Sequence, residues 1–317
     1  MNIRNILQQM ACLVLVMLLL VGCATPVAAP TTIPATATLV PPTPKPEATL
    51  SSTAEAATLT TEITIQIVYA NVDEVGTGLD VYAPSQPGPW PVVVVVHGIG
   101  QTRSGLWPLS KAIASQGAVV YNIDAMFTLR HKGASIERIA CAIRFARATA
   151  ADYGGDPGRI TLVGYSAGAS SGAVVALAGD DFEGDCVVTD ASALPDAFVG
   201  FEGLYDYATT DYTLAFEHTS LKEEDPDLWE AINPYSHIGR NPDLQVRLVH
   251  GDDIDLDWWD VPPEVSIEFH QALADAGYDV ELIVVDGADH TDLTSSYSDA
   301  FALAVQQVME LARSSSP

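Results

Sequence analysis

Basic residues are scarce in this sequence. It contains 14 lysines and arginines against 41 aspartates and glutamates, which gives a formal net charge of −27. Such a chain repels phosphate backbones and anionic headgroups, so nucleic acids and anionic lipid surfaces are excluded as partners and neutral or cationic ligands are favoured. The sequence also has no internal repeat and no nucleotide-binding glycine pattern after a strand, so we expect no cofactor.

The chain also lacks a membrane-spanning run near its start. Residues 11–21 are apolar but too few to cross a bilayer, and with the basic Arg4 before them they indicate a secretory signal peptide. The run ends at Leu20-Val21-Gly22-Cys23, which resembles the lipobox of bacterial lipoproteins. The resemblance implies a signal peptide at 1–23, lipid on Cys23 and an extracytoplasmic protein anchored to the bacterial cell membrane by this lipid alone. The alternative is an ordinary secretory signal with a chance cysteine.

Large apolar side chains are almost absent from residues 24–61, which consist mainly of Pro, Thr and Ala. Such a segment cannot bury enough surface to fold, and the prolines at 41–44 favour an extended conformation. We therefore expect a disordered tether at 24–61 and a single folded domain at 62–317.

Cysteines are few. Of the four, Cys12 and Cys23 fall in the signal region, which leaves Cys141 and Cys186 in the folded part. In an extracytoplasmic chain these two cysteines could form a disulfide, and the alternative is two buried thiols.

Strand and helix patterns alternate through residues 62–317. Residues 63–68 and 79–82 predict antiparallel strands at a sheet edge, and the five valines at 92–96 predict a strand buried on both faces. Further strands are expected at 118–123, 159–163, 197–201, 244–250 and 279–285, and helices at 104–117, 135–153, 167–178, 261–277 and 295–311. This alternation predicts an α/β fold with a mostly parallel central sheet flanked by helices. Residues 203–241 are irregular, aromatic and acidic, which indicates a small lid-like insertion.

The chemistry is expected at Gly164-Tyr165-Ser166-Ala167-Gly168, between an apolar strand and a helix of small residues. A serine on such a sharp turn is exposed as a nucleophile, and a Cβ at either glycine would clash with neighbouring backbone. The same pattern recurs at 168–172, but its Ser170 would lie inside the helix, so Ser166 is the candidate. The alternative role for Ser166 is an ordinary helix N-cap.

A serine hydroxyl needs a base, and His290 is the best placed of seven histidines. It follows the last predicted strand, at the sheet edge where the serine turn also lies. His97 and His250 each precede a glycine and are expected to support turns. The base in turn needs a carboxylate, and the loop after residues 244–250 offers Asp252, Asp253, Asp255 and Asp257.

Together these features resemble the α/β-hydrolase superfamily over residues 63–312, in its carboxylesterase and dienelactone-hydrolase-like branch. The similarity rests on the order of Ser166, acidic loop and His290, and on the motifs at 97–100, 153–157, 164–168 and 261–263. It implies the α/β-hydrolase fold, a Ser-His-Asp triad, and an oxyanion hole formed by the backbone of Ile99 and Ala167.

The acid departs from the pattern of the superfamily. An aspartate usually stands three residues after the glycine of a His-Gly pair, where this chain has Ile254. Because the loop is longer than usual, we predict Asp255 as the acid, with Asp253 as second choice. Asp253, Asp255, Asp257 and Glu264 also fit a calcium-loop spacing, but Trp258 replaces its glycine and Pro262-Pro263 interrupts it, so no metal is expected.

These features predict a serine hydrolase that cleaves small carboxylic esters through an acyl-enzyme intermediate. The same triad also suits a peptidase or amidase, because the site does not reveal the leaving group. The displaced acid leaves a third hypothesis, a non-catalytic binding lipoprotein that retains the fold.

Overall fold

The structure is a computed structural model that describes residues 58–71, 77–125, 133–206, 226–254 and 261–314. The chain divides into two units, Met1–Thr53 and Ala54–Pro317, and all described residues lie in the second. The expected signal peptide, the lipidated Cys23 and most of the tether therefore lie outside the described residues.

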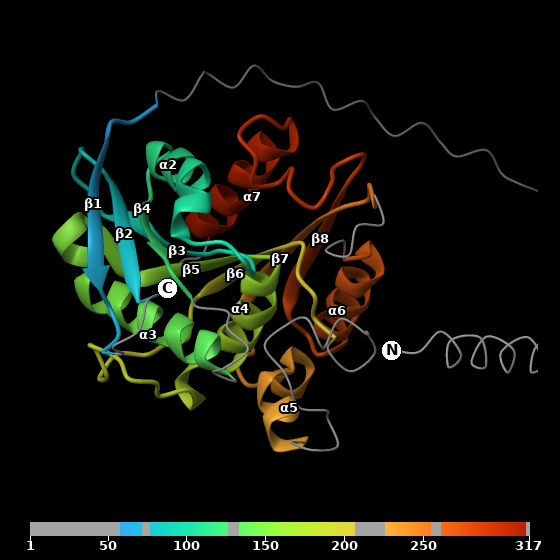
Figure 1. The fold of residues 1–317 in the computed structure, drawn as a ribbon. Coiled ribbons are helices and arrows are strands. Elements are labelled where there is room, and N and C mark those ends of the chain that lie inside the picture. Colours follow the sequence, from blue (N-terminus) through green and yellow to red (C-terminus); the bar gives the residue numbers. More distant parts are fainter. Residues whose placement is uncertain (1–57, 72–76, 126–132, 207–225, 255–260, 315–317) are drawn as a thin grey trace, which may run out of the picture. The chain divides into compact units, whose positions relative to one another are not determined.

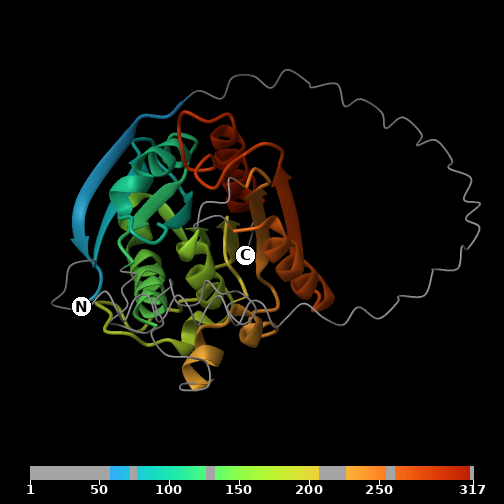
Figure 2. The same ribbon diagram turned by 45° about the vertical axis from the view of Figure 1, so that its right-hand side comes forward.

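An eight-stranded sheet forms the centre of the second unit, in the order β1-β2-β4-β3-β5-β6-β7-β8 (Figures 1 and 2). The strands are β1 (Thr61–Val68), β2 (Gly78–Pro84), β3 (Trp90–Val96), β4 (Val119–Ile123), β5 (Gly155–Tyr165), β6 (Ala197–Phe201), β7 (Gln245–Gly251) and β8 (Asp279–Val285). β1 and β2 pair antiparallel at one edge, and β4 to β8 run parallel with β3. The predicted mostly parallel sheet with an antiparallel edge is thus confirmed.

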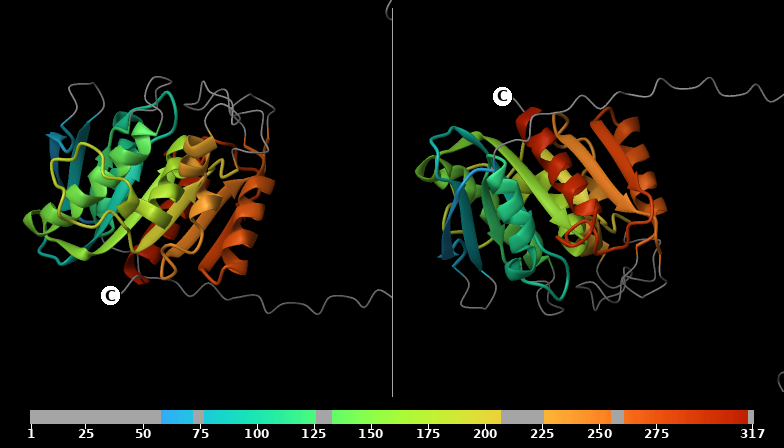
Figure 3. Two further views of the ribbon diagram at one scale, coloured as in Figure 1. Left: turned by 90° about the horizontal axis from the view of Figure 1, so that it is seen from below. Right: turned by 90° about the horizontal axis from the view of Figure 1, so that it is seen from above.

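Helices cover both faces of the sheet (Figure 3). α2 (Trp107–Ser115) and α7 (Ala300–Ser314) pack on one face, and α3 (Ala134–Thr149), α4 (Ala167–Ala178) and α6 (Pro263–Asp275) pack on the other. Alternate valines of β3 enter the two cores, because neighbouring side chains of a strand point to opposite faces. Shorter helices are α5 (Pro226–Ile232) and the 3₁₀ segments Arg103–Leu106, Ala150–Tyr153, Gly179–Asp181 and Pro234–His237.

α4 is buried along its whole length, and its amino-acid composition explains why. All its residues are buried, and its glycines, alanines and serines let it approach the sheet closely. At Gly172 an added Cβ would lie 3.2 Å from the Phe198 ring of β6. This close packing fixes the N-terminus of α4 against the carboxyl ends of β5 and β6.

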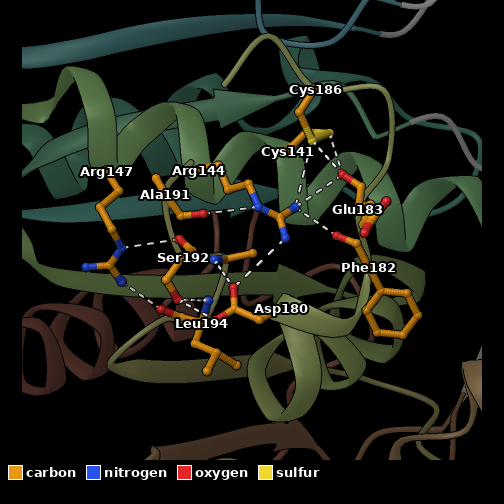
Figure 4. A network of polar contacts seen from close by, with 11 residues as sticks. Cys141, Arg144, Arg147, Asp180, Phe182, Glu183, Cys186, Ala191, Ser192 and Leu194 are labelled. Carbon is orange, nitrogen blue, oxygen red and sulfur yellow. Dashed lines mark hydrogen bonds and ion pairs between the residues drawn. A yellow bond between two sulfur atoms is a disulfide. The ribbon is translucent and has the colours of Figure 1, made fainter. Parts of the chain in front are cut away.

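A disulfide joins Cys141 of α3 to Cys186, which lies in the connection leading to β6 (Figure 4). The buried Arg144 guanidinium lies beside it and donates hydrogen bonds to the carbonyl oxygens of Phe182 and Ala191 at 2.7 and 3.2 Å. The disulfide and this arginine together tie an otherwise irregular crossover to α3. Of the two alternatives for these cysteines, the structure has the disulfide.

The last helix begins later than the sequence predicts, at Ala300 instead of Ser295. Residues 286–299 form a series of turns. The Asp289 carboxylate accepts hydrogen bonds from the N–H groups of Thr291 and Asp292, which favours a turn over a helix there. The extra turns set the position of His290.

The expected lid-like insertion is described only in part. Within residues 203–241 the structure describes 203–206 and 226–241, which contain α5 and a 3₁₀ segment. Residues 207–225 lie outside the described residues.

Candidate active site

Ser166 lies on the turn between β5 and α4, 7% exposed, with φ 55° and ψ −123°. Few residues with a Cβ adopt a positive φ, and such residues occur at functional sites where the surroundings enforce it. The surroundings here are tight, because an added Cβ at Gly164 would lie 2.3 Å from the Gly168 carbonyl oxygen. One at Gly168 would lie 2.4 Å from the His97 carbonyl oxygen. The predicted need for both glycines is confirmed.

Ser170, from the second serine pattern, lies inside α4 and is 1% exposed. Its hydroxyl donates to the Ser166 carbonyl oxygen at 3.3 Å and accepts from the Leu204 N–H at 3.0 Å. The hydroxyl of Ser170 is thus used within the fold, which agrees with its exclusion as the nucleophile.

His290 faces the Ser166 hydroxyl. Its Nε2 lies 3.1 Å from Ser166 Oγ, which is hydrogen-bond distance for a base that removes the hydroxyl proton. The His290 ring also lies 5.3 Å from the Tyr165 ring, measured between centroids. The structure therefore brings together the two residues that the sequence predicts as nucleophile and base, although they are far apart in the chain.

The acidic loop after β7 supports the backbone that carries His290. The Gly287 N–H donates to the Asp252 carboxylate at 2.7 Å, and the Asp253 N–H donates to the Ala288 carbonyl oxygen at 3.1 Å. Asp253 is exposed, and its carboxylate makes no hydrogen bond or ion pair with His290. Asp255, the first choice for the acid, lies outside the described residues.

A carboxylate that the sequence reasoning did not consider, Glu202, lies at the other nitrogen of His290. Its Oε2 is 3.7 Å from His290 Nδ1, which is ion-pair distance. Glu202 directly follows β6, has φ 54° and is 2% exposed. Among the described residues it provides the only carboxylate within ion-pair distance of His290. An acidic residue directly after the strand at 197–201 is the sequence signal that could have identified it.

Glu202 is itself held by the end of β7. Its Oε1 accepts a hydrogen bond from the Gly251 N–H at 2.6 Å, and its Oε2 lies 3.0 Å from Nε2 of the fully buried His250. The same Nε2 lies 2.7 Å from the Val261 carbonyl oxygen, and Nδ1 lies 2.8 Å from the Ser266 hydroxyl. Because Nε2 faces only oxygen acceptors in these contacts, it carries a proton and donates it to the Val261 carbonyl oxygen, with Glu202 Oε2 at ion-pair distance. His250 therefore lies against a buried carboxylate, whereas the sequence predicts only turn support for it.

The loop after β3 borders the serine. An added Cβ at Gly98 would lie 3.0 Å from Ser166 Cβ, so this glycine allows the loop to pass against the nucleophile. Among the described residues, the N–H of Ile99 donates no backbone hydrogen bond, and Ala167 is the first residue of α4, where N–H groups have no partner within the helix. Within the described residues both N–H groups are therefore available as donors, and their part in an oxyanion hole stays a prediction.

His97 stabilises this loop from beneath. Its Nε2 accepts from the Ala125 N–H at 3.2 Å, so Nδ1 carries the proton and donates to the Gly98 carbonyl oxygen at 2.8 Å. Burial lowers the pKa of His97, which favours this neutral form. This is the turn-supporting role that the sequence predicts for His97.

Within the described ranges, no group of three His, Cys, Asp or Glu side chains is placed to hold a metal ion. Asp255, Asp257 and Trp258 of the calcium-loop spacing lie outside those ranges. No helix in the described part of the chain is long and apolar enough to cross a membrane.

Known proteins with similar sequences are esterases. Residues 79–273 match the BD-FAE family. The chain is 30% identical over 250 residues to the Arabidopsis thaliana protein named "Probable isoprenylcysteine alpha-carbonyl methylesterase ICMEL1", an alignment that covers 72% of this chain and 50% of that protein. It is also 30% identical over 200 residues to the esterase LipQ of Mycobacterium tuberculosis, covering 59% of this chain and 46% of LipQ. The chain thus spans about half the length of these curated relatives.

Among solved structures, a truncated carbohydrate esterase from gut microbiota superposes with a TM-score of 0.67 at 20% sequence identity. The superposition covers 82% of this chain and 99% of that one. At this identity the likeness establishes the fold. With the match over residues 79–273, it shows that the chain has the α/β-hydrolase fold and belongs to the BD-FAE family.

Proposed function

We propose that this protein is a serine hydrolase that cleaves carboxylic esters through an acyl-enzyme intermediate. The observation that carries the proposal is the 3.1 Å contact between Ser166 Oγ and His290 Nε2. Ser166 itself lies on a turn and has a positive φ. The names of the relatives, which include a methylesterase and the esterase LipQ, support the ester class. Only the methylesterase name specifies an alcohol group, so the proposal extends to carboxylic esters and not to one alcohol.

The geometry supports a two-step reaction. His290 Nε2 takes the Ser166 hydroxyl proton as Oγ attacks the ester carbonyl, and the protonated imidazole then donates this proton to the departing alcohol oxygen. Water, deprotonated by His290, hydrolyses the resulting acyl-serine. The N–H groups of Ile99 and Ala167 would stabilise the negative oxygen in both steps, and losing one such donor typically costs about 3 kcal/mol of transition-state stabilisation.

Hydrolysis of p-nitrophenyl acetate and longer p-nitrophenyl esters by the full chain tests this function. We expect Ser166→Ala and His290→Ala each to lower kcat/KM by about 10⁴-fold or more, because serine and base act as one unit. Ser170→Ala is the matched control on the same helix and should retain most of the activity. A fluorophosphonate should label Ser166, as read by peptide mass spectrometry. Wild-type protein that neither hydrolyses these esters nor takes up the probe would contradict the proposal and favour a binding protein.

We also propose that the protein is an extracytoplasmic lipoprotein attached to the membrane through Cys23. The motif Leu20-Val21-Gly22-Cys23 and the Pro, Thr and Ala-rich residues after it motivate this proposal. The disulfide between Cys141 and Cys186 supports it, since disulfides persist mainly in oxidising compartments.

A further inference from the structure

We propose that Glu202 is the carboxylate that orients His290, and that the Gly251 N–H and His250 hold Glu202 in place. This inference rests on the proposed function, since Glu202 would act by orienting His290, the proposed base. It assigns the acid to the end of β6, one strand away from the loop where the superfamily resemblance places it.

Sheet order brings the three groups together. β6 lies between β5 and β7, and β8 lies beyond β7. Tyr165 pairs with Phe201, and Phe201 pairs with Val249, so the residues that follow these strands meet at one level of the sheet edge. Glu202 is thus placed between the serine turn and His250. A side chain in this position can reach beneath the imidazole that faces Ser166.

The contacts of Glu202 suit a carboxylate that must stay charged and fixed. It is 2% exposed, and a buried carboxylate is retained only when hydrogen bonds compensate the loss of water. The Gly251 N–H supplies one such bond to Oε1 at 2.6 Å. His250 Nε2, whose hydrogen bond goes to the Val261 carbonyl oxygen, lies at ion-pair distance from Oε2, 3.0 Å away. Oε2 also faces His290 Nδ1 at the ion-pair distance of 3.7 Å, and within the described residues that nitrogen has no hydrogen-bond partner. Catalytic hydrogen bonds are often long before substrate binds and shorten in the complex.

The position of the proton follows from this arrangement. His290 Nε2 must be free to accept the Ser166 proton, so Nδ1 carries the resting proton and directs it to Glu202 Oε2. When Nε2 takes the second proton, the imidazolium is stabilised by the Glu202 charge. Glu202 itself exchanges no proton during the reaction and is therefore a positioning residue.

The described aspartates of the β7 loop contact the backbone of the His290 loop and not the imidazole. Asp252 and Asp253 hydrogen-bond the backbone at Gly287 and Ala288, which holds the His290 loop without touching its ring. The other ionisable groups near His290 on the described elements are Tyr165, Asp289 and Asp292, and the two aspartates are hydrogen-bonded to N–H groups of their own turn. None of them is placed to replace Glu202 at Nδ1.

Carboxylate variants of the full chain test the assignment. Glu202→Gln keeps the shape and removes the charge, and we expect it to lower kcat/KM by about 10³- to 10⁴-fold, as for loss of the anion in other serine triads. Glu202→Asp should retain more activity than Glu202→Gln because it restores the charge. The matched controls Asp253→Asn and Asp255→Asn should change kcat/KM by less than about threefold. His250→Gln should lower kcat more than it raises KM.

The pH dependence of kcat/KM separates positioning from general damage. Without the Glu202 charge the imidazolium of His290 is less stable, so the acidic limb of the profile should move to lower pH in Glu202→Gln. A purely structural role would lower the whole profile without moving this limb, and would overturn the proposal. Activity in Glu202→Gln equal to that of wild type, or a loss in Asp255→Asn or Asp253→Asn as large as in Glu202→Gln, would also overturn it.

A second readout does not depend on turnover. In ¹⁵N-histidine NMR of the resting protein, the titration midpoint of His290 should fall in Glu202→Gln and stay unchanged in Asp253→Asn. If wild-type protein cleaves no ester but His290 responds in this way, the proposed function fails while the assignment of Glu202 holds. If His290 does not respond, the assignment fails whatever the activity.

Discussion

At the scale of single residues, the proposed nucleophile is held in a backbone conformation that its side chain disfavours. Ser166 has φ 55°, and its neighbours Gly164 and Gly168 have no room for a Cβ. Residues held in sparsely populated conformations typically cost about 1–3 kcal/mol. The packing around the turn between β5 and α4 compensates this cost.

Replacing the serine therefore has opposite effects on stability and activity. Ser166→Gly relieves the disfavoured angle, whereas Ser166→Ala retains it, and the greater freedom of glycine in the unfolded chain offsets part of the gain. We expect Ser166→Gly to exceed Ser166→Ala in free energy of unfolding by about 1 kcal/mol, measured by urea denaturation, with both variants inactive. A Ser166→Gly protein less stable than Ser166→Ala would show that this backbone conformation is not strained.

At the scale of elements, the connection between α4 and β6 depends on covalent and polar ties. The disulfide joins residues 45 positions apart, and Arg144 adds hydrogen bonds to carbonyl groups of the same connection. In the chain-entropy account, a disulfide that closes a loop of this length in the unfolded chain stabilises the folded state by about 4 kcal/mol. The crossover carries little secondary structure, so these ties fix its path to β6 and thereby to Glu202.

The double variant Cys141→Ala/Cys186→Ala should accordingly lose about 4 kcal/mol in free energy of unfolding, seen as a lower urea midpoint. Wild-type protein treated with a reductant is the control, and it should approach the variant. A loss below about 1 kcal/mol would indicate that Arg144 and the packing of the crossover suffice without the covalent bond.

At the scale of the whole molecule, the net charge bears on how the protein is attached to a membrane. The net charge of −27 repels anionic headgroups, so we attribute the proposed attachment to a membrane to lipid on Cys23 and not to the protein surface. The tether expected at residues 24–61 would then separate the active site from that membrane.

This proposal predicts a clear fractionation. Expressed at full length in a bacterium that processes lipoproteins, the protein should incorporate an alkyne-labelled fatty acid and sediment with membranes. Cys23→Ser should lose the label and the membrane association, whereas Cys12→Ser, the matched control within the signal region, should behave as wild type if its export is unaffected. Wild-type protein without label would refute lipidation and leave an ordinary secretory signal.

The amino-acid sequence alone determined most of the fold and half of the site. Local patterns sufficed for the strands, because five consecutive valines and the alternation of strands with helices have few structural solutions. They also sufficed for the turn at Ser166, where two glycines mark an enforced close approach, and for His290, which follows the last strand. The boundary of α7 was predicted five residues early, because side-chain hydrogen bonds of Asp289 favour turns before it.

Only the tertiary structure decided which carboxylate faces His290. The sequence pointed to the β7 loop because several aspartates cluster there. In the structure Asp252 and Asp253 hydrogen-bond the backbone of the His290 loop, and Asp255, the first choice, lies outside the described residues and stays a prediction. Glu202 stands alone after its strand and has no local signal beyond that position. Its place beside His290 and His250 arises from the order of β5, β6, β7 and β8 in the sheet. A sequence records which residues end strands, whereas the distance between those ends depends on how the strands pair.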